Sequence, residues 1–212
     1  GGTQGVRREA QARVQSALVD LETLRKRVEA ALANRRRRVV DSESLIPSAV
    51  LLLLTNRTEP HVLFAKRTER VAHHKGQYSF PGGIAETWDG SRLETALREA
   101  REEIGLPPDA VEILGTLDDT ETRATQFVIT PFVGLIRGPV SYTPDGKEIE
   151  RVLEVPLAAL LDPANFRVEM WERDDHTSPV YFYDYGGETI WGATARILKQ
   201  FLDLVFPEGA PR

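Results

Sequence analysis

Three glutamates at helical spacing are the residues of this chain best suited to chemistry. Glu99, Glu102 and Glu103 stand at positions i, i+3 and i+4, so in a helix their side chains share one flank. Like charges at this spacing repel by roughly 0.2–0.5 kcal/mol, and clustered carboxylates raise one another's pKa unless a cation compensates them. Hard divalent cations take oxygen ligands from carboxylates, water and substrate phosphates. The cluster therefore predicts a magnesium or manganese site that binds a phosphate-containing substrate.

A plain surface helix is the alternative to a metal site. Pairs between Glu94 and Arg98, and between Arg98 and Glu102, would then hold the charges in solvent. The preceding turn, Pro81-Gly82-Gly83, favours the metal site, because glycine allows the backbone to approach a ligand closely.

The glutamates lie in a segment with clear helix boundaries. Ser91-Arg92-Leu93-Glu94 reads as a capping box, and Gly105 ends the helix. Apolar residues recur at helical spacing and predict one buried stripe, formed by Leu93, Ala96, Leu97, Ala100 and Ile104.

This part of the chain resembles the Nudix box, G-x(5)-E-x(7)-R-E-U-x-E-E-x-G-U, in which U is aliphatic. Arg98 to Leu106 reads REAREEIGL and matches the second half of the box, and Gly83 matches its opening glycine. The chain departs from the box in three ways: the first acid is Asp89 rather than Glu, eight residues rather than seven separate it from Arg98, and the U position holds the small Ala100. The resemblance implies an α/β Nudix fold, with a mixed β-sheet sandwiched between α-helices, and metal-dependent cleavage of a diphosphate.

The residues before the box narrow the resemblance to one subfamily. Coenzyme A pyrophosphatases carry a signature similar to L-L-T-x-R-S-x(3)-R-x(3)-G-x(3)-F-P-G-G. Arg67, Gly76 and Phe80-Pro81-Gly82-Gly83 fall at its spacing, and the longer box loop and the closing Ile190–Arg196 segment are also similar to that subfamily. The Thr, Ser and second Arg of the signature are replaced by Ala65, Thr68 and Ala72.

The metal ligands follow from the box. We expect Glu99 and Glu103, one helical turn apart, to bind the metal directly, with Glu102 as a further ligand or a water-mediated partner. The backbone carbonyl of Gly83 is expected to join them. Arg98 is expected to orient the carboxylates through Asp89. The alternative for Arg98 is a purely surface role.

A general base must reach the attacking water. Nudix enzymes use either a glutamate of the box, which here points to Glu102, or an acid from a later loop. The best loop candidate is Glu148, with Glu150 behind it; both are equally compatible with a solvated turn.

Basic residues before the Gly-Gly turn are candidates for substrate binding. Arg67, His74 and Lys75 would neutralise phosphates, and Phe80 belongs to the same signature; the alternative is a basic surface loop. Aromatic residues later in the chain offer stacking surfaces for an adenine, although core packing is their commoner role. They are Trp171, Trp191 and the Tyr181–Tyr185 segment.

The remaining pattern is mixed α/β. We predict a hairpin from Ser48–Leu54 and His61–Lys66, strands at Val111–Leu117, Phe127–Ile136 and around Tyr181–Tyr185, a helical turn at Leu157–Leu161 and a closing amphipathic helix at Thr189–Phe206. A chain of 212 residues with 41% hydrophobic content suits one globular domain with an extension. We place the extension, a basic amphipathic helix, at residues 1–38 and the Nudix hydrolase domain at residues 39–212.

The charge is unevenly distributed along the chain. The net charge is −5, yet residues 1–38 hold ten Lys/Arg against four Asp/Glu and end in Arg35-Arg36-Arg37-Arg38. Such a helix docks on an acidic body or on a second subunit, which predicts a homodimer in the latter case. We do not expect a nucleic acid partner, because no aromatic residue interleaves the arginines.

The absence of cysteine fits a cytoplasmic protein, and no apolar run is long enough to span a bilayer.

These features predict a magnesium- or manganese-dependent Nudix pyrophosphohydrolase. The favoured substrate is coenzyme A or acyl-coenzyme A, cleaved to adenosine 3′,5′-bisphosphate and a 4′-phosphopantetheine. The alternatives are hydrolysis of ADP-ribose, NADH or dinucleoside polyphosphates, and a Nudix-fold sensor that binds a nucleotide without cleaving it.

Overall fold

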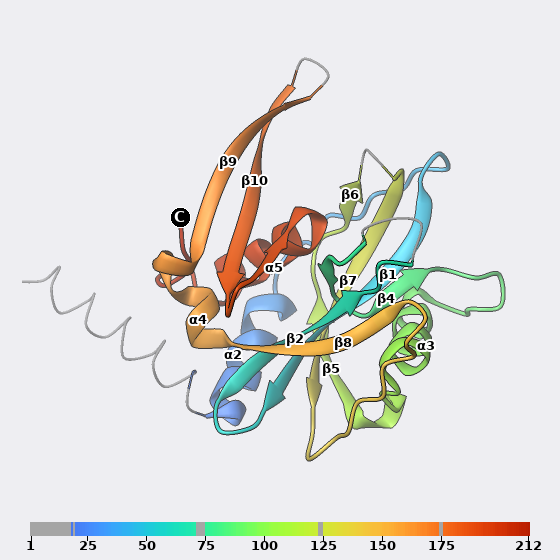
Figure 1. The fold of residues 1–212 in the computed structure, drawn as a ribbon, viewed down its shortest axis with the longest axis horizontal. Coiled ribbons are helices and arrows are strands. Elements are labelled where there is room, and N and C mark those ends of the chain that lie inside the picture. Colours follow the sequence, from blue (N-terminus) through green and yellow to red (C-terminus); the bar gives the residue numbers. More distant parts are fainter. Residues whose placement is uncertain (1–17, 19, 71–74, 123–124, 174–175) are drawn as a thin grey trace, which may run out of the picture.

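The computed structural model describes residue 18 and residues 20–70, 75–122, 125–173 and 176–212 (Figure 1). Within these residues the centre of the molecule is an eight-stranded sheet with the order β3-β2-β1-β7-β5, to which β4, β6 and β8 add through β1, β7 and β2. The strands are β1 Ile46–Asn56, β2 Pro60–Arg67, β3 Tyr78–Ser79, β4 Gly82–Ile84, β5 Val111–Thr116, β6 Thr120–Thr122, β7 Phe127–Ile136 and β8 Ile149–Pro156. β1 and β7 are parallel and the other pairs are antiparallel, which confirms the predicted mixed sheet.

The Gly-Gly turn lies inside this sheet. β1 and β2 pair with each other only next to their connection, from Asn56↔Pro60 to Leu53↔Leu63. Farther along, β3 pairs with β2 and β4 pairs with β1, so the segment between them fills the gap between the two long strands. The N–H of Leu51 donates to the carbonyl of Pro81 at 2.8 Å. Gly82 and Gly83 are therefore held by strand pairing rather than by a free loop.

Helices cover both faces of the sheet (Figure 1). α3, Arg92–Ile104, buries Ala96, Ala100 and Ile104 against one face. α2, Leu21–Ala33, and α5, Gly192–Val205, share a second core on the opposite face. Apolar burial on both faces is the main favourable term for this three-layer arrangement.

The last predicted helix begins later than the sequence suggested. Glu188–Trp191 forms β11, which pairs with β10, His176–Tyr185, and α5 starts only at Gly192. The turn between β10 and β11 is Gly186-Gly187, and both glycines have positive φ, 59° and 84°. That turn closes a tight hairpin. The prediction of a helix from Thr189 was therefore wrong for its first three residues.

Residues 20–38 of the basic N-terminal segment dock on the body of the same chain, and residues 1–17 lie outside the described residues. Asp20 caps α2, which ends at Ala33. Arg35 pairs with Asp118 and Arg37 with Asp119. The arginine run is therefore an extended strap, and the prediction that it ends the helix was wrong. Leu24, Val28 and Leu32 of α2 are buried in the core that α5 shares. The predicted domain boundary between residues 38 and 39 stays a prediction.

A hairpin projects from the opposite end of the chain (Figure 1). It follows α4, Leu157–Leu161, and a short 3-10 turn at Pro163–Asn165, and joins β9, Phe166–Arg173, to β10. Trp171, Phe182 and Trp191 form a ring cluster with centroids 5.9–6.1 Å apart, and Arg167 lies over Phe182. These aromatic side chains pack on one another. No helix among the described residues is long and apolar enough to cross a membrane.

Candidate active site

The glutamate helix has the ends that its sequence predicted. The Ser91 hydroxyl accepts the N–H of Glu94 at 3.2 Å, and the carboxylate of Glu94 accepts the N–H of Gly90 at 2.8 Å. The return bond of the capping box is thus shifted by one residue. Gly105 caps the other end with φ +70°, a conformation that glycine adopts without strain. α3 therefore starts and stops at fixed points beside the Gly-Gly turn.

Glu103 is the most deeply buried of the three glutamates. Its side chain is 6% exposed, and one of its carboxylate oxygens accepts the N–H of Gly82 at 3.0 Å. Burial raises the pKa of Glu103 to about 8, although the Gly82 hydrogen bond and Arg67 oppose the shift. The nearest Arg67 nitrogen is 3.9 Å away. A second positive charge near Glu103 would therefore favour its ionised form.

Glu99 lies directly against Gly83. A Cβ at position 83 would come within 2.5 Å of the carboxyl carbon of Glu99, so any larger residue there would displace that carboxylate. Burial raises the pKa of Glu99, and hydrogen bonding to Arg98 lowers it. The carboxylates of Glu99 and Glu103 thus meet the Gly-Gly backbone from the same helix.

Arg98 joins the box loop to the helix. Its Nε and Nη2 donate to the two carboxylate oxygens of Asp89, each at 2.9 Å, and its Nη1 donates to Glu99 at 2.7 Å and to Glu102 at 3.2 Å. Nη2 also donates to the carbonyl of Ile84 at 3.1 Å. The predicted contacts of Arg98 with Asp89 and Glu99 are present, and its orienting role stays a prediction.

Asp89 has a further partner that the sequence did not reveal. The hydroxyl of Thr95, which is fully buried, donates to Asp89 at 2.9 Å. The signal available in the sequence was a polar side chain beside the apolar stripe of the helix. Arg98 and these hydrogen bonds hold the pKa of Asp89 well below its usual range.

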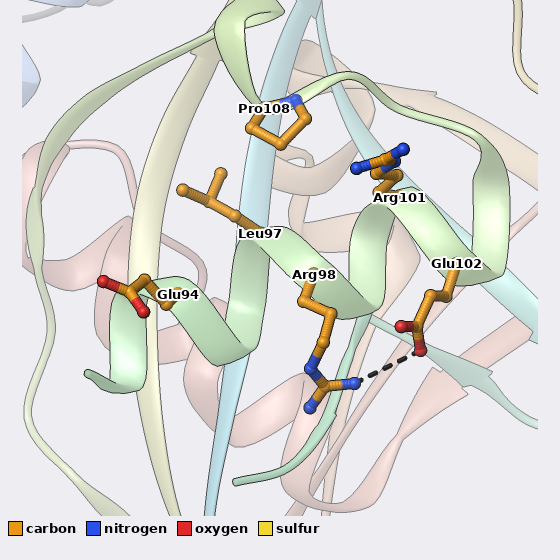
Figure 2. A pocket seen from close by; sticks show the side chains of 6 residues that line it. All are labelled: Glu94, Leu97, Arg98, Arg101, Glu102 and Pro108. Carbon is orange, nitrogen blue, oxygen red and sulfur yellow. Dashed lines mark hydrogen bonds and ion pairs between the residues drawn. The ribbon is translucent and has the colours of Figure 1, made fainter. Parts of the chain in front are cut away.

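Glu102 points away from the buried pair. Its side chain is 60% exposed and it lines a surface groove of about 500 Å³ on the outer flank of α3 (Figure 2). The other residues that line this groove are Glu94, Leu97, Arg98, Arg101 and Pro108. Figure 2 shows the link from Arg98 to Glu102, which is the contact that ties Glu102 to the site.

Arg67 and Glu148 complete the site from the sheet side. Arg67, at the end of β2, donates from Nη2 to a carboxylate oxygen of Glu148 at 3.3 Å. Its other terminal nitrogen faces Glu103. Arg67 therefore stands between the buried glutamate of the helix and the acid of the later loop, which are 45 residues apart in sequence.

The other predicted site residues lie in varied surroundings. Lys75 is exposed, and His74 lies outside the residues that the structure describes. Phe80 is 2% exposed and its ring stacks on Phe64, with 5.1 Å between centroids. It therefore supports the turn from within the core, and the predicted contact with substrate gains no support from its position. Glu150 is exposed on β8.

The oxygen ligands of this site suit a hard divalent cation. Among the described residues, no group of three acidic or histidine side chains is placed to hold a metal by itself. Two carboxylates do converge on the Gly-Gly backbone, Glu103 at the N–H of Gly82 and Glu99 against Gly83. Magnesium commonly binds through one or two carboxylates together with substrate phosphates and water, so this incomplete protein shell fits the ion.

Comparison with known proteins decides the family. The NUDIX domain family matches residues 45–179. A protein of Enterobacter sp. (strain 638) named Uncharacterized Nudix hydrolase NudL is 36% identical over 153 residues, which cover 72% of this chain and 79% of that protein. The chain belongs to the Nudix family.

Two further relatives agree with this assignment. The NudL protein of Escherichia coli (strain K12 / DH10B) is 34% identical over 154 residues, covering 72% of this chain and 79% of that protein. The crystal structure of a MutT/nudix family protein from Enterococcus faecalis has a TM-score of 0.53 at 16% identity, covers 81% of this chain and 66% of that chain, and supports the fold alone. The predicted Nudix membership, the α/β fold and the hydrolase class are thereby confirmed.

Proposed function

We propose that this Nudix hydrolase cleaves the diphosphate linkage of a nucleoside diphosphate derivative with the help of Mg²⁺ or Mn²⁺. The observation that carries the proposal is the convergence of Glu99 and Glu103 on the Gly82–Gly83 backbone, with Arg98 fixing one carboxylate and Arg67 facing the other. Glu99, Glu103 and the carbonyl of Gly83 would hold the ion. When bound, it neutralises charge on the phosphate oxygens and lowers the pKa of bound water.

The remaining residues account for the rest of the reaction. Hydrolysis forms one P–O bond to water, breaks the P–O bond of the anhydride and gives two phosphate monoesters. Glu148 is our candidate for the group that accepts the proton of water, because it faces the site through Arg67 and is accessible to solvent, with a side chain 58% exposed. Glu102 is the second candidate. Arg67 supplies positive charge for the diphosphate.

Coenzyme A or an acyl derivative is the substrate we favour. Two observations on residues that resemble the coenzyme A signature support this choice: Arg67 contacts Glu148, and Gly76 adopts φ +64° in the connection to β3. Lys75 and His74 belong to that connection and are proposed to contact the phosphates. The products would be adenosine 3′,5′-bisphosphate and a 4′-phosphopantetheine.

A substrate panel tests this function. The protein is incubated with coenzyme A, acetyl-coenzyme A, ADP-ribose, NADH and a dinucleoside polyphosphate, with Mg²⁺ or Mn²⁺ or neither, and the products are resolved by chromatography. We expect the fastest metal-dependent turnover with coenzyme A or its acyl derivative. Faster turnover of ADP-ribose, NADH or the dinucleoside polyphosphate would make that compound the proposed substrate in place of coenzyme A. Saturable binding without turnover of any compound would favour a sensor.

A further inference from the structure

One aspartate organises the loop that carries the candidate base. The same carboxylate oxygen of Asp145, Oδ1, accepts the backbone N–H groups of Lys147, Glu148 and Ile149 at 3.0, 3.0 and 2.9 Å. The N–H of Gly146 donates to the carbonyl of Ile149 at 3.0 Å. Three backbone N–H groups converge on this one acceptor oxygen, so the side chain of Asp145 defines the backbone at Glu148.

The same loop is fastened to the end of the glutamate helix. The N–H of Asp145 donates to the carbonyl of Glu103 at 3.0 Å, and the N–H of Thr143 donates to the carbonyl of Ile104 at 2.8 Å. These carbonyls are in the last turn of α3, where no intrahelical donor follows. The loop therefore satisfies the helix end that bears the buried carboxylate.

A third attachment joins the loop to β2. The N–H of Thr68 donates to the carbonyl of Glu148 at 2.8 Å, and its hydroxyl donates to the carbonyl of Lys147 at 2.8 Å. Thr68 follows Arg67 directly and is buried. The backbone on both sides of the candidate base is thus held by the residue next to the arginine of the site.

We propose that Asp145 is a positioning residue, which fixes the loop so that the Glu148 carboxylate stands opposite Glu103 across Arg67. The side chain of Glu148 is 58% exposed and its carboxylate contacts Arg67, so the position of its backbone sets where the carboxylate reaches. The inference deepens the proposed function and rests on it. Displacement of a reacting group by about 1 Å can cost about a hundredfold in rate.

The test compares two substitutions of Asp145 at saturating substrate. Asp145→Ala removes the acceptor, and we expect kcat to fall about ten- to hundredfold with a smaller change in KM. Asp145→Asn keeps an amide oxygen that can accept N–H groups, and we expect it to recover most of the loss. If the side chain acted through its charge on substrate or metal, the two variants would be equally impaired, and that result would overturn the proposal.

Hydrogen exchange gives a readout independent of turnover. Without substrate, Asp145→Ala should speed amide exchange at residues 147–149 while leaving the rest of β8 protected. Unchanged exchange at those amides would also overturn the positioning role. Asp162→Ala is the matched control, because Asp162 accepts a single backbone N–H, from Ala164 at 2.9 Å, at another turn. It should keep normal turnover.

A double variant separates this inference from the proposed base. Asp145→Ala should add little loss of kcat in a Glu148→Gln background, because both changes act on one group. A full multiplicative loss in the double variant would show that Asp145 acts elsewhere and would overturn the proposal. Normal turnover of Glu148→Gln alone would instead reject Glu148 as the base, while the exchange measurement would still decide whether Asp145 holds the loop.

Discussion

Arg98 and Asp89 form a two-point ion pair, in which two guanidinium nitrogens each donate to a different carboxylate oxygen at 2.9 Å. The pair fixes the plane of the guanidinium group. Its third nitrogen is then directed at Glu99, at 2.7 Å. The loop that precedes α3 and carries Asp89 therefore determines where Glu99, a predicted metal ligand, lies. Asp89 acts on Glu99 through Arg98 and does not contact it directly.

Substitution of Arg98 should disorder the glutamates without unfolding the helix. We expect Arg98→Ala to lower kcat about 10–100-fold, the usual range for a partner that orients a metal ligand. Arg98→Lys should be nearly as impaired, because an ammonium group cannot make the two-point contact. Steady-state kinetics across a Mn²⁺ titration measures both. Arg101→Ala, on an exposed position of the same helix, should keep normal rates; equal losses at both positions would argue against the orienting role.

Asp89 should contribute an acid-sensitive part of the stability. Its pKa in the folded protein is depressed below the usual value of 3.8 for an aspartate, mainly by the hydrogen bonds from Arg98. Its contribution is therefore present above about pH 4 and is lost as the pH falls through the folded pKa. We expect the difference in free energy of unfolding between wild type and Asp89→Asn to shrink from pH 6 to pH 3, as measured by urea denaturation. A difference that does not change with pH would contradict this prediction.

Glu103 and Glu102 are adjacent in sequence but should respond differently to the same change. Glu103→Gln keeps an oxygen that accepts the N–H of Gly82, so the fold should persist, while turnover should fall more than about a hundredfold. Glu102→Gln, at a side chain 60% exposed, should cost much less. Rates and circular dichroism of both variants check this. Near-normal turnover of Glu103→Gln would remove the main support for the metal site.

Local sequence signals predicted the glutamate helix well, but not which glutamate would be buried. Ser91, Gly105 and the apolar stripe fix the ends and inner face of α3 by short-range chemistry. Spacing places Glu102 and Glu103 on one flank, yet they differ between 60% and 6% exposure. That difference arises from the Gly82 turn, which approaches from the sheet and is invisible to helical periodicity.

Long-range pairing also explains what the sequence missed elsewhere. Ile190 fits a helical pattern, but the Gly186-Gly187 turn pairs its segment with β10 instead. The arginine run reads as a basic face, but Asp118 and Asp119, some 80 residues later, bind it. Neither partner can be identified from local spacing.

Asp119 should be a stability residue rather than a catalytic one. It is 3% exposed and accepts the hydroxyl of Thr130 and the N–H of Val40, each at 2.9 Å, besides the ion pair with Arg37. Asp119→Ala leaves these donors without their acceptor, so we expect a loss of about 1–3 kcal/mol in the free energy of unfolding. Glu121→Ala removes an exposed pair with Arg38 and should cost less than about 1 kcal/mol. Equal costs in urea denaturation would show that the strap is not anchored at Asp119.

Gly83 should separate activity from stability. Its φ is not positive, so the backbone accepts alanine, but the new Cβ would lie 2.5 Å from the carboxyl carbon of Glu99. A glutamate carboxylate can swing away at small cost, which moves the predicted ligand out of the site. We therefore expect Gly83→Ala to keep its melting temperature within a few degrees and to lose about ten- to hundredfold in kcat, with more metal needed for half-maximal activity.

Gly90→Ala is the control for this change, because it makes the same kind of contact in the same loop. Its Cβ would lie 2.9 Å from a carboxylate oxygen of Glu94, which caps α3 and does not face Gly83. Loss of that cap should cost some stability and leave kcat nearly normal. Because Glu99 lies against the Gly-Gly turn, the two variants should show opposite patterns. Gly83→Ala should lose activity, and Gly90→Ala should lose stability. Normal turnover of Gly83→Ala would show that Glu99 is not needed at that point.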